Sequence, residues 1–226
     1  MSAGITHGAR LDRAASATRF AGDGFELGLR HAAIGKRATI STSLRGGVRS
    51  LAAAGVTAGR TRATESSGEL ALSLFPASGT TLGPITFGLT MRAAGTVVGH
   101  HLTEPTTRTL SYAFGTATVG PSVRMNRAIG GGKATAQLDV PLAGVVVQSY
   151  SAVRSITGLA NVDTRWTTLG ALRAGGLSLS YEPASRGRWG IVYQYRLQGA
   201  AYDATQPVRS LTHALSIGIV WRGGAR

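Results

Sequence analysis

Residues 211–221 read Leu-Thr-His-Ala-Leu-Ser-Ile-Gly-Ile-Val-Trp, and this stretch decides the fold. Large apolar side chains stand at every second position from Leu211 to Trp221, apart from His213. The positions between them carry mostly small or weakly polar residues: Thr212, Ala214, Ser216 and Gly218. Successive side chains of a β-strand point to opposite faces, so this alternation predicts a strand with one apolar and one weakly polar face.

Other segments repeat the alternation, chiefly residues 25–33, 37–49, 69–75, 85–93, 134–146 and 189–197. No stretch of 12 or more residues has the 3.6-residue period of an amphipathic helix. Clusters of turn-forming residues separate the segments, at 46–47, 76–79, 130–132, 182–187 and 203–207. We therefore expect one all-β antiparallel domain. Pro141 lies inside an alternating run and has no amide hydrogen for the sheet, so a bulge or a strand end is expected there.

Three features favour a closed antiparallel transmembrane β-barrel over a soluble sandwich. Several runs span about 9–13 residues, whereas soluble strands average about 5–6 and a tilted membrane strand needs about 9–11. The polar faces carry Ser, Thr, Gly, Ala, Gln and single Arg residues, which suits a crowded interior. Aromatic residues gather near the ends of runs, and four of them are predicted to lie at the membrane interfaces: Trp166, Tyr181, Trp189 and Trp221.

The pattern of links suggests how the barrel is threaded. If the last strand descends to the periplasm, the longer links at 97–108, 154–165 and 199–209 share one side. The shorter links at 46–50, 76–81, 120–121 and 182–187 share the other side, as short periplasmic turns do in such barrels. Counting back gives about 12 strands, within a range of 10–12. Residues 1–23 are then a periplasmic or luminal N-terminal segment, and residues 24–226 form the barrel.

Composition narrows the class of protein further. The chain has 226 residues, a net charge of +14, 15% charged and 6% aromatic residues, and no cysteine. The basic residues are scattered, and aromatic stacking platforms are sparse, so no nucleic-acid partner is expected although a soluble basic β-protein is the alternative. No run of 18 apolar residues predicts a transmembrane helix, and residues 1–24 lack the apolar core of a signal peptide.

Charged residues on the polar faces of separate strands form the main candidate site: Arg30, Arg45, Arg49, Arg92, Arg196, Glu26 and Glu69. Inside a narrow bore an excess of Arg focuses a field that favours anions. A second interpretation is that these Arg residues pair with Glu26, Glu69 and Asp139 and plug the bore. A third is that Arg residues near strand ends bind lipid phosphates or lipopolysaccharide.

Catalytic and metal sites have weaker signals. His100 and His101 are adjacent, so a strand would point them apart and make a poor metal pair. His213 lies near Ser210 and Ser216, and some outer-membrane lipid hydrolases use such Ser/His pairs. The glycines before Lys133 lack phosphate-loop spacing and predict a turn. We expect no metal, no cofactor and no catalytic residue.

The run that ends at Trp221 resembles the terminal strand of bacterial outer-membrane barrels, although residues 222–226 follow it. This resemblance implies a location in the bacterial outer membrane and the barrel assembly machinery as a partner. A barrel after a short N-terminal segment also resembles the C-terminal domain of autotransporters, in which a helix threads the lumen; residues 9–20 could form it. The expected functions are a small pore for anionic solutes, a translocator that exports or anchors a passenger, or a lipid-modifying enzyme.

Overall fold

The computed structural model describes residues 1–12, 19–53, 61–76, 81–82, 84–102, 108–150, 161–168, 170–185, 187–203 and 208–222. Regular structure in these ranges consists of strands. Among these residues there is no helix that is long and apolar enough to cross a membrane.

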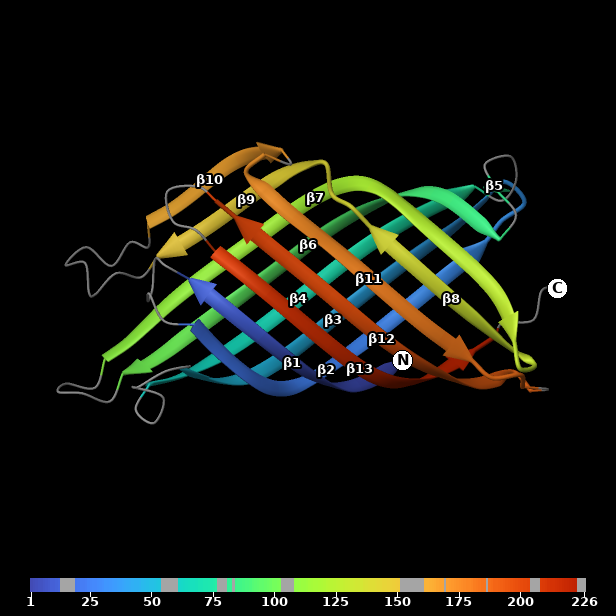
Figure 1. The fold of residues 1–226 in the computed structure, drawn as a ribbon, viewed down its shortest axis with the longest axis horizontal. Helices are drawn as coiled ribbons and strands as arrows, with labels where there is room; N and C mark the ends of the chain where they lie inside the picture. The colour runs from blue at the N-terminus through green and yellow to red at the C-terminus, as the bar shows by residue number, and fades with distance from the viewer. Residues whose placement is uncertain are drawn as a thin grey trace.

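Long antiparallel strands make up the molecule (Figure 1). Their bounds are β1 (Ser2–Asp12), β2 (Arg19–Ile34), β3 (Ala38–Ala53), β4 (Thr61–Pro76), β5 (Thr81–Leu82), β6 (Ile85–Leu102), β7 (Arg108–Ile129), β8 (Gly132–Asp139), β9 (Ala143–Tyr150), β10 (Asn161–Thr168), β11 (Leu172–Glu182), β12 (Trp189–Tyr202) and β13 (Val208–Trp221). Ten of them form a ring in the order β7-β8-β11-β12-β13-β1-β2-β3-β4-β6, and β6 pairs again with β7. The prediction of a closed antiparallel barrel is confirmed, with ten strands.

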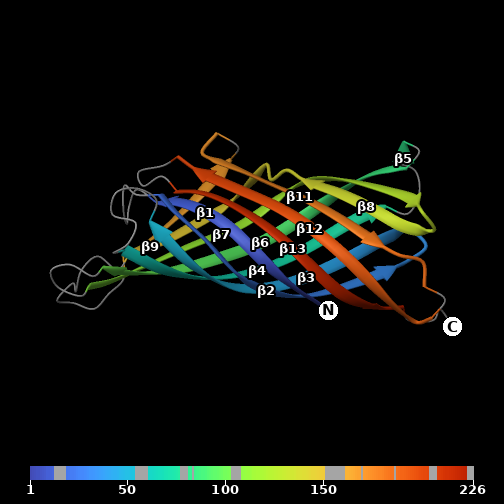
Figure 2. The same cartoon turned by 60° about the horizontal axis from the view of Figure 1, so that its bottom comes forward.

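The barrel has two distinguishable ends. The end at which β13 finishes is here named the C-terminal end, and the opposite end is named the loop end (Figures 1 and 2). At the C-terminal end β7 turns into β8 through Gly130 and Gly131, whose φ angles are 55° and 78°. Such left-handed angles at both central residues are those of a tight hairpin turn. The loop end carries the links from β1, β3, β6, β9 and β12 to the strands that follow them.

The bulge predicted at Pro141 is confirmed. β8 and β9 both lie along β7, with Ser122 opposite Asp139 and Val119 opposite Ala143, so the register shifts by one residue at Pro141. Gly120 of β7 faces this bulge, and a Cβ atom there would lie 2.1 Å from the carbonyl oxygen of Val140. Glycine is therefore required at this position of the strand.

Two predicted turns are wrong, at 46–50 and at 120–121. Gly46 and Gly47 lie inside β3, and Gly120 lies inside β7. A Cβ on Gly47 would lie 2.9 Å from the Phe25 carbonyl oxygen of the neighbouring strand, so close packing between strands explains this glycine. Each false turn divides one strand into two, so both raised the expected number of strands.

The assignment of residues 1–23 to a separate N-terminal segment is also wrong. β1 is a barrel strand that pairs with β13 from Ser2 opposite Gly218 to Asp12 opposite Val208, and with β2 on its other side. The helix proposed over residues 9–20 is excluded at 9–12 and 19–20, and its residues 13–18 lie outside the described part of the chain. β1 forms because β13 and β2 would otherwise leave unpaired backbone groups in lipid.

The two faces of the strands differ as the alternation predicts. Large apolar side chains point outward and are exposed, including Phe25 at 74%, Ile217 at 59% and Leu27 at 65%. In the middle of the barrel, the opposite face of the strands carries mostly polar residues, which are enclosed by the ring. An apolar outer surface around a polar interior is the arrangement of a membrane-spanning barrel.

Candidate functional site: the barrel interior

Two cavities occupy the interior of the barrel. The larger has a volume of about 140 Å³, and the smaller has a volume of about 40 Å³. The structure places all seven predicted luminal residues around them: Glu26 and Arg49 at the larger cavity, Arg30 at the smaller, and Arg45, Glu69, Arg92 and Arg196 at both. The residues shared by both cavities separate one from the other.

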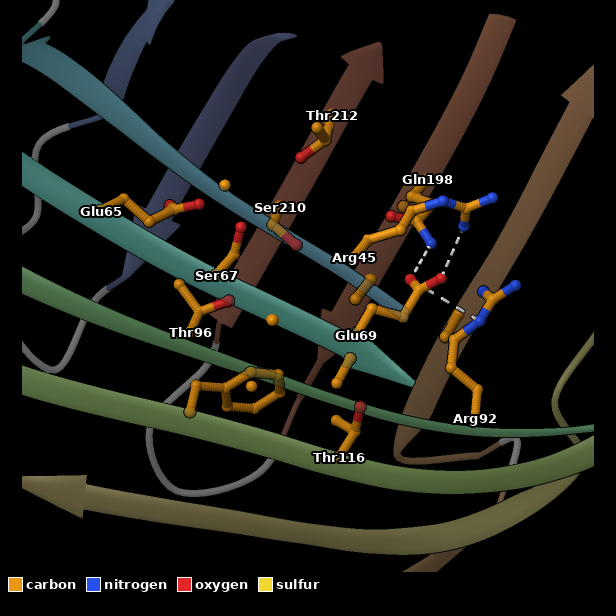
Figure 3. A pocket seen from close by; sticks show the side chains of 18 of the residues that line it. Arg45, Glu65, Ser67, Glu69, Arg92, Thr96, Thr116, Gln198, Ser210 and Thr212 are labelled. Carbon is orange, nitrogen blue, oxygen red and sulfur yellow. Dashed lines mark hydrogen bonds and ion pairs between the residues drawn. The ribbon is translucent and has the colours of Figure 1, made fainter. Parts of the chain in front are cut away.

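Glu69 of β4 lies at the centre of the group of side chains that separates the two cavities (Figure 3). Its carboxylate accepts a 2.9 Å hydrogen bond from Arg45, and Arg92 lies at 3.8 Å. From β12, Arg196 lies 3.6 Å away and the amide of Gln198 donates a hydrogen bond. In the ring β12 stands five positions from β4 in either direction, so these contacts cross the full width of the bore.

Asp139 of β8 is a second centre of hydrogen bonding. It pairs with Arg92 at 2.7 Å and accepts hydrogen bonds from Ser122 at 2.7 Å and from Gln137 at 2.9 Å. Arg92 therefore connects Asp139 to Glu69. A buried carboxylate is tolerated when its oxygens are satisfied by charged and neutral donors in this way.

A third group lies towards the loop end and includes residues that sequence reasoning missed. Glu65 is 2% exposed and pairs with Arg49 and, at 3.7 Å, with Arg10. The Arg10 guanidinium lies 5.2 Å from the ring centre of Tyr112. Arg10 was missed because β1 was not expected to be a strand. Its position on the same face as Gly4, Thr6 and Gly8 is the signal that could have found it.

Apolar side chains face inward at the loop end and were not predicted. One cluster comes from β2, β3, β4 and β6 and contains Phe20, Leu51, Ala53, Ala63 and Val98. The other comes from β7, β9, β11, β12 and β13 and contains Tyr112, Phe114, Val146, Leu172, Tyr202 and Val208. Together they line nearly the whole circumference, so an apolar zone lies beyond the polar cavities.

Arg124 of β7, also missed, lies towards the C-terminal end of the bore. Its guanidinium stands 3.7 Å from the centre of the Phe75 ring and donates to Gln137 at 2.9 Å. Arg30 is an exposed residue, and among the described residues no carboxylate lies within ion-pair distance of it.

Positive charge exceeds negative charge around the cavities. The guanidinium groups that line them belong to Arg10, Arg30, Arg45, Arg49, Arg92 and Arg196, and the carboxylates to Glu26, Glu65, Glu69 and Asp139. Most of these groups are paired, so the interior is both cross-linked and net positive.

The predicted interface aromatics lie at both ends of the barrel. Trp189 and Trp221 are opposite each other on β12 and β13 at the C-terminal end, and both are well exposed. Tyr181 lies at the same end, where its hydroxyl donates to the Ile129 carbonyl oxygen at 3.4 Å. Trp166 is 85% exposed and lies on β10, which is placed towards the loop end (Figure 1).

The Ser/His arrangement considered for a lipid hydrolase does not form around His213. His213 points outward, whereas Ser210 lines the larger cavity and Ser216 is buried on the inward face. The side chains of His100 and His101 lie outside the described residues. Within the described ranges no group of three or more His, Cys, Asp or Glu side chains could hold a metal ion.

Comparisons with known proteins identify the fold. No family model matches the chain, and no curated protein matches it in sequence. Among solved structures, the translocator domain of the autotransporter NalP from Neisseria meningitidis matches with a TM-score of 0.57 and 11% identity, covering 98% of this chain and 88% of that one. The outer membrane protease OmpT from Escherichia coli matches with a TM-score of 0.54 and 5% identity, covering 96% and 95%.

The chain has the fold of a bacterial outer-membrane β-barrel. The predicted location in the bacterial outer membrane agrees with this fold and with the exposed apolar surface around the ring. At these identities the comparisons carry the fold alone.

Proposed function

We propose that this barrel conducts small anions through a bore that is closed at rest. The excess of guanidinium groups around the two cavities supports the preference for anions, and Arg30, without a carboxylate partner among the described residues, is a site where an anion would first bind. Arg side chains that line a pore favour anions because their positive charge attracts them.

Two features in series close the bore under this proposal. The first is the set of contacts that Glu69 makes with Arg45, Arg92, Arg196 and Gln198 across the barrel. The second is the pair of inward apolar clusters at the loop end, because an apolar constriction excludes water and ions when it is narrow. A low conductance with rare openings is expected from such a bore.

Planar lipid bilayers test this proposal with the wild type and Glu69→Gln. The substitution removes the charge that holds three Arg residues and should raise both the open fraction and the preference for chloride over potassium. The preference is measured as the reversal potential in a salt gradient. Asp163→Asn, in an exposed pair with Arg165 outside the cavities, is the matched control and should behave as the wild type. Failure of both the wild type and Glu69→Gln to conduct, although both fold, overturns the proposal.

A translocator that exports or anchors a passenger is the second candidate, favoured by the similarity to the NalP translocator domain. A reporter domain fused before Met1 tests it in a Gram-negative host. Cleavage of the reporter by protease added to intact cells supports export through or with this barrel. A reporter that stays in the periplasm while the barrel is assembled excludes it. Recognition by the barrel assembly machinery stays a prediction from β13 and belongs to either candidate.

A further inference from the structure

A row of polar side chains interrupts the apolar outer surface of the barrel. Asp23 of β2, His7 of β1 and His213 of β13 are direct register partners on three neighbouring strands and all point outward. Nδ1 of His7 lies 2.7 Å from Oδ1 of Asp23, and Nδ1 of His213 lies 2.7 Å from the hydroxyl of Tyr195 on β12. The contact made by Nδ1 thereby fixes the orientation of each imidazole, and Nε2 can bind an external partner.

The polar row lies near the edge of the apolar band that faces the loop end. His213 lies eight residue steps along β13 from Trp221 at the C-terminal end. With a rise of about 3.3 Å per residue and a tilt of about 40°, they span about 20 Å of membrane, where the apolar band of such barrels is about 25 Å tall. Ionisable side chains that face lipid are costly and indicate function when they occur.

An apolar groove opens beside this row. The groove has a volume of about 380 Å³. The three residues of the polar row and Tyr195 line one edge of it, and Ile5, Phe25 and Leu215 are among the apolar residues that line the rest. These three side chains are 57–74% exposed. A groove with hydrogen-bonding groups at one edge and apolar side chains along the rest is complementary to an acyl chain with a polar head group.

A basic row lies four residues closer to the loop end on the same outward face. This row consists of Arg19 on β2, Arg209 on β13 and Arg173 on β11. Leu11 of β1 lies opposite both Arg19 and Arg209, and Ala201 of β12 lies opposite both Arg209 and Arg173. Asp203 lies 3.6 Å from Arg209 and 3.7 Å from Arg173, and no carboxylate among the described residues lies within ion-pair distance of Arg19. Four residues of tilted strand separate the two rows by about 10 Å along the membrane normal.

We propose that this face binds lipopolysaccharide through its phosphorylated and acylated sugar head. The guanidinium groups of Arg19, Arg209 and Arg173 bind the phosphates, since Arg forms paired hydrogen bonds with phosphate. His7 and His213 bind sugar hydroxyl or amide groups, and one acyl chain lies in the groove. The loop end carries most of the links that such barrels present outside the cell, so this face belongs to the outer leaflet, which contains this lipid.

Native mass spectrometry of the purified barrel tests the site with three probes: lipid A with its phosphates, lipid A without them, and phosphatidylglycerol. Lipid A with its phosphates should bind most tightly. Arg19→Gln/Arg209→Gln should weaken its binding about tenfold, because charge-assisted hydrogen bonds are lost. His7→Ala/His213→Ala should weaken the binding of both forms of lipid A. Arg188→Gln, an exposed Arg at the C-terminal end, is the matched control and should leave it unchanged.

Three results overturn the proposal: phosphatidylglycerol binding as tightly as lipid A, an Arg19→Gln/Arg209→Gln variant that binds as the wild type does, and a control that is weakened equally. The Arg variants change exposed side chains, whereas the His213 side chain is half-buried, so the folding of every variant is checked by the shift in gel mobility on heating. A binding defect in a variant with normal mobility is a defect of the site.

Discussion

At the scale of single residues, the interior shows how a buried carboxylate is surrounded by donors inside a membrane protein. Asp139 is 7% exposed, yet Arg92 provides an opposite charge and Ser122 and Gln137 provide neutral donors. A buried ion pair stabilises little in total, but removal of one partner leaves the other charge uncompensated. Asp139 and Arg92 therefore depend on each other more than any exposed pair does.

Asp139→Asn should lower the free energy of unfolding by about 3 kcal/mol, because Arg92 loses its closest carboxylate and the new amide hydrogens face the guanidinium. Urea-induced unfolding in lipid vesicles, followed by tryptophan fluorescence, measures this change. The matched control is Asp163→Asn, whose pair with Arg165 is about half-exposed and should contribute less than about 1 kcal/mol. Equal losses in the two variants would show that the interior pair has no special role.

The sequence was sufficient to find the luminal residues that stand on strongly alternating strands. Arg45, Arg92 and Glu69 could be placed on the polar face because Leu, Ile or Met flank them on the other face. Their partners across the bore, such as Gln198 for Glu69, could not be found in this way. Which strands stand opposite each other across the bore depends on the number of strands and on which two strands close the ring. The alternation of side chains within one strand gives no information on either.

At the scale of strands and turns, glycine has two roles that look alike in the sequence. Gly130 and Gly131 form a turn with left-handed φ angles, whereas Gly46, Gly47 and Gly120 lie inside strands. The strand glycines raised the expected number of strands, because each was interpreted as a turn. The strand ends near 76, 130, 182 and 203 were predicted because Pro, Ser or Asp residues or several glycines follow them. The bulge at Pro141 was predictable because proline lacks the amide hydrogen.

Gly131→Ala should destabilise the barrel by about 1 kcal/mol, because an L-residue is strained at its φ of 78°. A Cβ atom there would meet no other atom within 4 Å, so the cost is conformational alone. Gly95→Ala inside β6 is the matched control: it has equal space and no left-handed φ, and should be neutral or slightly stabilising. Urea midpoints of the two variants measure the difference. A loss in Gly95→Ala as large as in Gly131→Ala would contradict the conformational explanation.

At the scale of the whole molecule, closure of the ring explains why the first residues belong to the barrel. β1 has few large apolar residues, so its alternation of Ala3, Ile5, His7, Ala9 and Leu11 against small residues was too weak to predict a strand. Its formation is imposed by its neighbours, because β13 and β2 each present a full row of backbone groups to it. A requirement of the complete ring thus overrides a weak local signal.

Deletion of residues 2–12 should abolish stable insertion into membranes. Without β1, the edges of β13 and β2 face lipid, and each unsatisfied backbone group there costs several kcal/mol. The measurement is the gel mobility of the refolded chain before and after heating, together with its resistance to protease in vesicles. Deletion of residues 223–226, which follow β13, is the control and should leave both unchanged. A chain without residues 2–12 that still shows heat-dependent mobility would mean that β13 and β2 can pair directly, and that nine strands suffice.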